Sequence, residues 1–131
     1  PTDIYDNPAN TFVASFIGSP AMNLMNGVTK GGAFTAENTT IKGIAAPDGP
    51  IILGFRAEDA ELTDATAQIE APVYTMELLG DATMVTLKAG GELVSVKAHK
   101  DFRAQIGDVV KIAVPSAICH VFDATTGNRL D

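Results

Sequence analysis

The sequence predicts an all-β domain, either a closed β-barrel or a sandwich, preceded by one short helix. About eight short segments alternate apolar and polar residues, which is the pattern of a half-buried strand. Turns rich in glycine and proline separate these segments, and one stretch alone shows helical spacing. Many short strands joined by such turns are typical of barrels and sandwiches.

The helical stretch lies near the start of the chain. Asn7 is expected to cap it, and Pro8 suits its first position, where no N–H donor is needed. Its apolar positions are Phe12, Val13, Phe16 and Ile17. Gly18 can adopt the left-handed conformation that closes a helix, and Pro20 prevents its continuation. A helix this short must dock its apolar face, either on its own domain or on another domain linked to it.

The strands follow in order. Residues 24–35 suit a hairpin that turns at Gly31-Gly32, and Pro-Asp-Gly-Pro at 47–50 is a turn by its chemistry. Pro72 marks an edge, a bulge or a start within its segment. Helical turns are expected at residues 57–62 and 100–105, the first with a loop as its alternative. The other expected strands cover residues 39–45, 51–56, 69–79, 110–114 and 117–122.

The most specific local pattern predicts a hairpin around Gly90-Gly91. With these glycines as a two-residue turn, Leu87 faces Val94 and Val85 faces Val96. All four side chains then lie on one face of the hairpin. Because turn and alternation agree, the register is well specified.

Composition limits the kind of protein. A chain of 131 residues suits one domain, and 46% hydrophobic residues indicate a globular one. A net charge of −7 with nine scattered basic residues argues against a nucleic-acid partner. No apolar run is long enough to span a bilayer, and no secretory leader is visible. One cysteine excludes an internal disulfide and suits a reducing compartment, so we expect a cytoplasmic location.

Four motifs in order resemble one protein family. They are Ile4-Tyr5 with Pro8-Ala9-Asn10, Phe12-Val13-Ala14, Phe16-Ile17-Gly18-Ser19-Pro20 and Met22-Asn23; Gly54-Phe55-Arg56-Ala57-Glu58; Glu77-Leu78-Leu79-Gly80; and Cys119-His120-Val121-Phe122-Asp123. The run is similar to the ATP-binding subunits of ABC importers for maltose-like sugars and glycerol-3-phosphate, from the end of the ATPase domain through the regulatory domain. Ala57 departs from the family's Gly-x-Arg-Pro-Glu motif, where proline stands.

The resemblance implies an OB-fold-like barrel of the transport-associated type. It divides the chain into a junction segment with a helix, 1–22, following an ATPase domain, and a regulatory barrel, 23–131. It marks as regulatory or structural positions Phe16, Gly18, Pro20, Asn23, Gly54, Arg56, Glu58, Glu77, Gly80, His120 and Phe122.

The resemblance also implies a role in regulation and dimerisation without chemistry. The expected partners are the subunit's own ATPase domain, a second copy of the subunit, the transporter's membrane subunits indirectly, and an inhibitory regulatory protein. The location would be the inner face of the cell membrane. ATP and Mg²⁺ are expected on the ATPase domain and no cofactor on this chain, which lacks a Gly-x-x-x-x-Gly-Lys-Ser/Thr loop. The alternative function is a barrel that binds a small oxyanion or sugar.

No catalytic or metal site is expected from the residues themselves. Glu58 and Asp59 suit solvated or capping carboxylates. Arg56 could clamp an anion, but an ion pair with Glu58 or Glu77 is favoured. Cys119 is expected to be a small buried hydrophobe, and two distant histidines with one thiol make no zinc pattern.

The aromatic residues near the junction leave two alternatives. Tyr5, Phe12 and Phe16 could anchor a partner. Packing on their own domain is slightly favoured, because most such stripes belong to a core.

Overall fold

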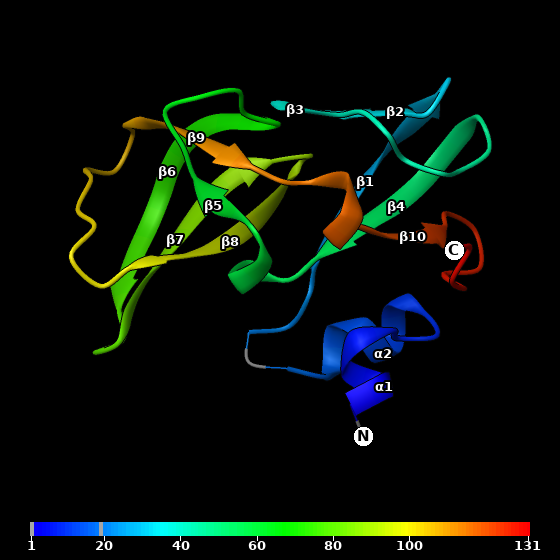
Figure 1. Ribbon diagram of the computed structural model, residues 1–131, viewed down its shortest axis with the longest axis horizontal. Helices are drawn as coiled ribbons and strands as arrows, with labels where there is room; N and C mark the ends of the chain where they lie inside the picture. Colours follow the sequence, from blue (N-terminus) through cyan, green and yellow to red (C-terminus); the bar gives the residue numbers. More distant parts are fainter. Residues whose placement is uncertain (1, 19) are drawn as a thin grey trace.

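The computed structural model describes residues 2–18 and 20–131, so Pro1 and Ser19 of the predicted junction lie outside the described residues. Two short helices precede a sheet (Figure 1). The helices are α1 (Thr2–Asp6) and α2 (Thr11–Phe16), and the 3-10 turns are η1 (Ala57–Asp59) and η2 (Ser116–Ile118). The strands are β1 (Asn23–Lys30), β2 (Ala33–Ala36), β3 (Thr39–Ile41), β4 (Gly49–Phe55), β5 (Glu61–Leu62), β6 (Ile69–Leu78), β7 (Ala82–Ala89), β8 (Glu92–His99), β9 (Val109–Ala113) and β10 (His120–Asp123).

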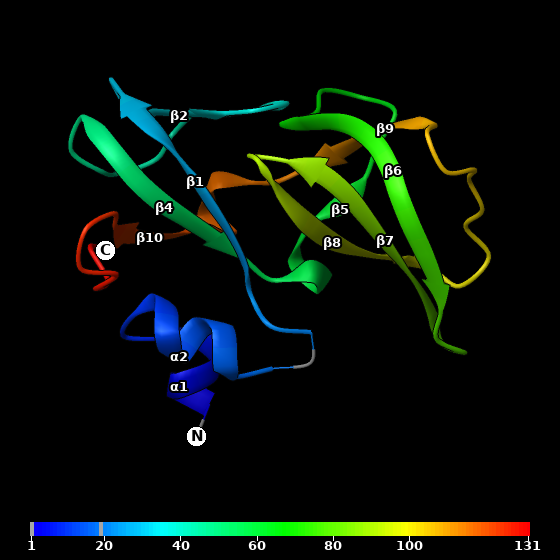
Figure 2. The same ribbon diagram turned by 180° about the vertical axis from the view of Figure 1, so that it is seen from behind.

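The strands form one curled, half-barrel sheet. Their hydrogen-bonded order is β10-β4-β1-β2-β3-β6-β7-β8, and β9 pairs with both β5 and β6. Figures 1 and 2 show two halves, one with β1–β4 and β10 and the other with β5–β9. The two helices lie beside the first half, next to the C-terminus. The larger apolar core draws residues from both halves. The ten strands of the described residues confirm the prediction of an all-β fold.

One buried side chain joins the two halves where the sheet curls back on itself. Asn23, at the start of β1, is 7% exposed. Its side-chain Nδ2 donates to the carbonyl of Ser95 at 2.8 Å, and its Oδ1 accepts from the Ser95 N–H at 2.8 Å. The amide therefore acts like a neighbouring strand for β8, which would otherwise present unpaired backbone groups at a sheet edge. This is the role that the structure gives to the predicted position Asn23.

The hairpin of β7 and β8 has the predicted register. Val85 pairs with Val96 and Leu87 with Val94, and all four side chains are fully buried. Gly90-Gly91 forms the turn with positive φ angles of 63° and 70°. Alternation excludes a slip by one residue, which would expose the whole apolar face, and the turn fixes the register.

Pro72 lies where β6 changes partner. Residues 69–72 of β6 pair with β9, and the pairing with β7 begins at Val73. A shift of register, of the kind a β-bulge causes, follows between Val73 and Thr75. Proline cannot donate to a ladder, so it suits this point of exchange. Of the three predicted alternatives, the nearby shift of register is of the bulge kind.

The N-terminal helix differs from the prediction. The predicted single helix is two short ones, and the cap of α2 is Asn10, whose Oδ1 accepts from the Val13 N–H at 2.8 Å. Asn7 therefore does not cap α2, because it lies in the connection between the helices. Ala14 is the fully buried residue of α2, whereas Phe12 and Phe16 are 68% and 71% exposed. The expectation that these rings pack on their own domain is wrong, because the helix approaches the sheet through its small residue.

Three other boundaries need correction. Residues 100–105 form a turn followed by irregular chain instead of the expected helical crossover. The strand expected at 39–45 ends at Ile41, and the one expected at 117–122 begins at His120, because η2 occupies 116–118. Pro115 precedes that turn in an extended conformation. The alternation of apolar and polar residues does not predict such a turn.

We predict that the two faces of the β7–β8 hairpin respond differently to a charge. Val96→Asp should lower the free energy of unfolding by about 3–5 kcal/mol, because an unpaired carboxylate would be buried. Thr86→Asp should cost about 1 kcal/mol, mainly through loss of its 3.2 Å contact with the Ser95 hydroxyl. Denaturant unfolding monitored by circular dichroism measures both, and equal losses would contradict the facial assignment.

Candidate functional site

The junction between the helices and the barrel holds most of the predicted site residues. α2 rests on the barrel through Ala14, which packs in a small buried cluster with Met22 and Phe122. Gly54 in β4 makes room for this cluster, since a Cβ there would lie 2.6 Å from the Met22 sulfur and 3.1 Å from the Phe122 ring. The predicted positions Gly54 and Phe122 thus form the floor on which the helix sits.

Arg56 follows directly after β4 and is 2% exposed. Its Nη1 donates to the carbonyl of Ile17 at 2.6 Å, and its Nη2 donates to the carbonyl of Tyr5 at 3.0 Å. The guanidinium carbon also lies 4.2 Å from the centroid of the Tyr5 ring. One buried cation therefore holds the backbone of the junction at two places, just beyond α2 and within α1.

Gly18 allows this contact. Its φ is +104°, a region that side chains rarely adopt, and a Cβ there would lie 2.7 Å from Arg56 Nη1. The chain leaves α2 at Ile17, whose N–H still donates to the Val13 carbonyl, and turns at Gly18. The predicted role of Gly18 in ending the helix is confirmed, and the arginine explains why the position must also be small.

The predicted ion pair of Arg56 is wrong. Among the described residues, the ion pairs do not include Arg56. Glu58 instead accepts a hydrogen bond from the Tyr5 hydroxyl, which raises the pKa of Tyr5, with burial adding to the effect. Glu77 lies opposite Met84 in the β6–β7 hairpin, away from the junction. Glu58 therefore acts on Arg56 indirectly. It holds Tyr5, whose ring and carbonyl contact the Arg56 guanidinium.

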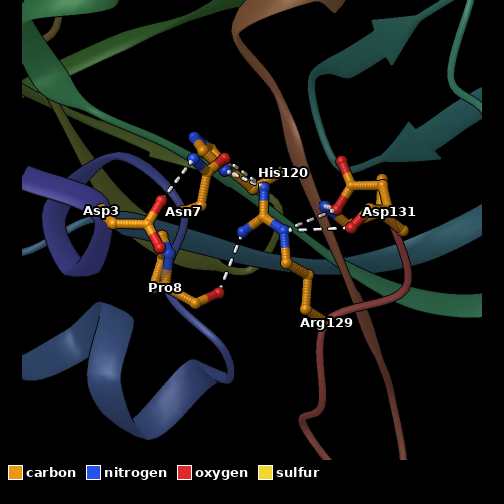
Figure 3. A network of polar contacts seen from close by, with 7 residues as sticks. Asp3, Asn7, Pro8, His120, Arg129 and Asp131 are labelled. Carbon is orange, nitrogen blue, oxygen red and sulfur yellow. Dashed lines mark hydrogen bonds and ion pairs between the residues drawn. The ribbon is translucent and has the colours of Figure 1, made fainter.

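A second arginine, near the C-terminus, binds the connection between the two helices (Figure 3). Arg129 Nη1 donates to the Pro8 carbonyl at 2.9 Å, and Nη2 lies 3.4 Å from Asn7 Oδ1 and 2.8 Å from His120 Nδ1. Its Nε lies 3.4 Å from the Asp131 carboxylate. Arg129 was missed in the sequence, because its main partner is a backbone carbonyl, which every residue carries.

Backbone hydrogen bonds reinforce this second contact. The Arg129 N–H donates to the Ala9 carbonyl, and the Thr11 N–H donates to the Gly127 carbonyl, both at 2.9 Å. The C-terminal segment also covers the outer edge of β10, where the Leu130 N–H donates to the Val121 carbonyl at 2.9 Å. The helices and the C-terminal segment therefore form one hydrogen-bonded unit on the barrel.

The remaining predicted positions divide into two groups. His120 lies at the junction, in contact with Arg129. Phe16 and Pro20 belong to the junction segment itself and are exposed. Glu77 and Gly80 are exposed at the β6–β7 hairpin, where Gly80 has a φ of 75°. The structure therefore does not bring the Glu77 motif into the junction.

The titratable groups near the junction show little that resembles a catalytic site. Burial raises the pKa of the Cys119 thiol to about 12, with Asp131 adding to the effect, so the thiol is protonated at neutral pH. Cys119 packs against the core, as expected, but it is half-buried instead of buried. Burial and then Glu58 raise the pKa of Asp59, while His120 and Arg56 oppose the rise. In the part of the chain that the structure describes, no three histidine, cysteine or acidic side chains are grouped to hold a metal.

An exposed aromatic pair lies on the outer side of α2. The Phe12 and Phe16 rings meet edge to face, with centroids 5.3 Å apart and planes at 60°. Large apolar side chains so exposed on a helix are typical of an interaction surface. The structure leaves the two phenylalanines exposed, whereas Tyr5 is held by its own domain through Arg56 and Glu58.

These features define a class of protein: a curled β-barrel domain that clamps a helical junction at its side. The chain matches the model of the TOBE domain over residues 53–122, more than half of its length. It therefore belongs to the TOBE domain family, and its barrel is OB-like. The resemblance to transport-associated domains of importer ATP-binding subunits is confirmed.

Several relatives match nearly the whole chain. It is 38% identical to the sn-glycerol-3-phosphate import ATP-binding protein of Jannaschia sp., 36% identical to that of Burkholderia mallei and 30% identical to that of Psychromonas ingrahamii. The matches cover 99%, 98% and 100% of this chain, but 38%, 39% and 38% of the relatives. The chain therefore spans under half the length of these relatives. Within its described residues, no helix is long and apolar enough to cross a membrane.

We predict that removing the Arg56 guanidinium weakens the junction. Arg56→Met keeps the length of the side chain but leaves the Ile17 and Tyr5 carbonyls unpaired, which should cost about 2–4 kcal/mol. Arg103→Met is the matched control, because Arg103 is exposed and donates to the carbonyls of its near neighbours Lys100 and Phe102. It should change stability by less than about 0.5 kcal/mol. Denaturant unfolding of both variants tests the assignment, and a neutral Arg56→Met would refute it.

Proposed function

We propose that this chain is the regulatory domain of the ATP-binding subunit of an ABC importer for carbohydrates or glycerol-3-phosphate-like solutes. The observation that carries this proposal is the match of nearly the whole chain to import ATP-binding proteins. The family match supports it, since the matched model is that of a TOBE domain and not of an ATPase domain. The solute follows from the names of the relatives.

The junction supplies a physical means of regulation. Segment 1–22 would connect the barrel, 23–131, to an ATPase domain, and its helices are held by Arg56 and Arg129. A flexible linker would absorb a rotation of the barrel. A connection fixed at several backbone carbonyls would transmit that rotation to the domain that it connects. Regulation would then act by changing how two ATPase domains approach one another.

The exposed aromatic pair suggests where the ATPase domain packs. Phe12 and Phe16 are in the junction itself, so they would lie next to any domain that it connects. The other proposed partners are a second copy of the subunit, the membrane subunits indirectly, and an inhibitory regulatory protein. This assembly would place the domain at the cytoplasmic face of the membrane.

The chemistry would belong to the ATPase domain, which would hold ATP and Mg²⁺. The paired glycines of this chain, Gly31-Gly32 and Gly90-Gly91, are hairpin turns between β1 and β2 and between β7 and β8. Neither pair is followed by the Lys-Ser/Thr that a phosphate-binding loop requires. The domain itself would therefore regulate hydrolysis without performing it.

One groove favours the alternative, a small-ligand site. An open groove of about 460 Å³ lies beside the β7–β8 hairpin, lined by Glu37, Tyr74, Lys88, Gly91, Glu92 and Leu93. Its size falls within the range of ligand pockets. Two carboxylates beside a single lysine disfavour an oxyanion, whereas Tyr74 and the carboxylates suit a neutral sugar. Lys88 already lies 5.2 Å from the centroid of the Tyr74 ring, which leaves that face less free for stacking.

We predict that the isolated chain does not bind nucleotide. Titration calorimetry with Mg-ATP should give no measurable heat, because the chain has no loop to hold the phosphates. The full-length subunit is the positive control and should bind. Micromolar affinity in the isolated chain would overturn the assignment of the chemistry to another domain.

We also predict weak self-association of the isolated chain and a tighter pair for the full-length subunit. Two copies at −7 repel, so association should grow with concentration and with salt, which screens the repulsion. Sedimentation velocity over a concentration series measures this. Phe12→Ser with Phe16→Ser should reduce the association of the isolated chain. Leu93→Ser, at a side chain 50% exposed on β8, is the matched control. A strictly monomeric full-length subunit would remove dimerisation from the proposal.

A further inference from the structure

The contact between Arg129 and His120 fixes the protonation state of the histidine. Arg129 Nη2 lies 2.8 Å from His120 Nδ1. A guanidinium only donates hydrogen bonds, so Nδ1 must be the acceptor and must carry no proton. His120 is therefore neutral in this arrangement, with its proton on Nε2. Adding a proton to Nδ1 would place two donors and two positive charges against each other.

Charged groups from several elements face this histidine. Arg129 and Asp131 belong to the C-terminal segment, whereas Arg56 and Asp59 flank the chain after β4. Burial lowers the pKa of His120 most, and Arg129 lowers it next. Asp131 opposes them with a larger effect than Arg56 adds, and Asp59 opposes them least. The surroundings as a whole favour the neutral imidazole that the hydrogen bond requires.

We propose that His120 and Arg129 form a proton-sensitive latch, in which protonation of His120 displaces Arg129 and loosens the helical junction from the barrel. The geometry carries this step, because the same guanidinium holds the Pro8 carbonyl and contacts Asn7. Backbone hydrogen bonds from Arg129 to Ala9 and from Thr11 to Gly127 lie next to it. The ligand of the switch is a proton, and the moving element is the segment that carries α1 and α2.

The direction of the pH dependence follows from the lowered pKa. Histidine in a released or unfolded chain has a pKa of about 6.5. The latched His120 binds its proton at a lower pH, so the released state takes up the proton first. The attachment is therefore complete above about pH 6.5, weakens as the pH falls below it, and reaches its minimum below the latched pKa.

Nuclear magnetic resonance of the 131-residue chain tests the latch directly. The ring nitrogen shifts should show the Nε2–H tautomer of His120 at pH 7.5 and a titration midpoint below about 6.5, the ordinary value for histidine. His99, whose side chain is 73% exposed, is the control histidine for the variants below. Exchange of the Thr11 and Arg129 amides, corrected for the intrinsic effect of pH, should rise several-fold as His120 protonates.

Two variants separate protonation from general acid weakening. His120→Asn places a carbonyl oxygen near the position of Nδ1 and does not titrate, so junction exchange should stay at its neutral-pH level down to pH 5. His120→Lys cannot accept and is always charged, so exchange should be about tenfold faster already at pH 7.5. His99→Asn should keep the pH dependence of the native chain. An Nδ1–H tautomer in the native chain, or an unchanged pH dependence in His120→Asn, would overturn the proposal. The tautomer decides if a variant does not fold.

Discussion

The buried guanidinium of Arg56 is the interaction on which the junction depends. A buried charge is costly unless it is well hydrogen-bonded, and both bonds found for Arg56 lead to carbonyls of the helical segment. Its Nε is buried without a partner among the described residues. Moving the helices away would therefore leave more of the cation unpaired and would open the space that Gly18 keeps free. The position of the helices, the conformation of Gly18 and the pairing of the Arg56 charge therefore depend on one another.

The sequence predicted the barrel better than the junction for a physical reason. In the β7–β8 hairpin, alternation reports which side is buried, and Gly90-Gly91 fixes the register. In the short α2, the apolar stripe suggested that Phe12 and Phe16 face inward, but close approach occurs through Ala14. Asn7 and Asn10 have the same capping chemistry, so composition alone could not choose between them.

The candidate site was predictable only where side chains match a known motif. Gly18, Arg56, Glu58 and His120 come from distant parts of the chain, and only the resemblance grouped them. The structure brings all four to the junction through contacts with Tyr5, Ile17 and Arg129. The partners of Arg56 and Arg129 are largely backbone carbonyls, which every residue carries, so the sequence cannot identify them. The Glu77 motif lies elsewhere, because order along the chain does not determine proximity in a folded sheet.

Attachment through carbonyls also determines what the junction can respond to. A carbonyl does not titrate, so the Arg56 contacts with Ile17 and Tyr5 hold over a wide range of pH. The Arg129 contacts include a titratable acceptor, the imidazole of His120. The helices therefore have one anchor that is insensitive to protons and another that is not. Loss of the second anchor alone would leave the segment tethered at Arg56 and free to pivot there, which is a change of orientation instead of a release.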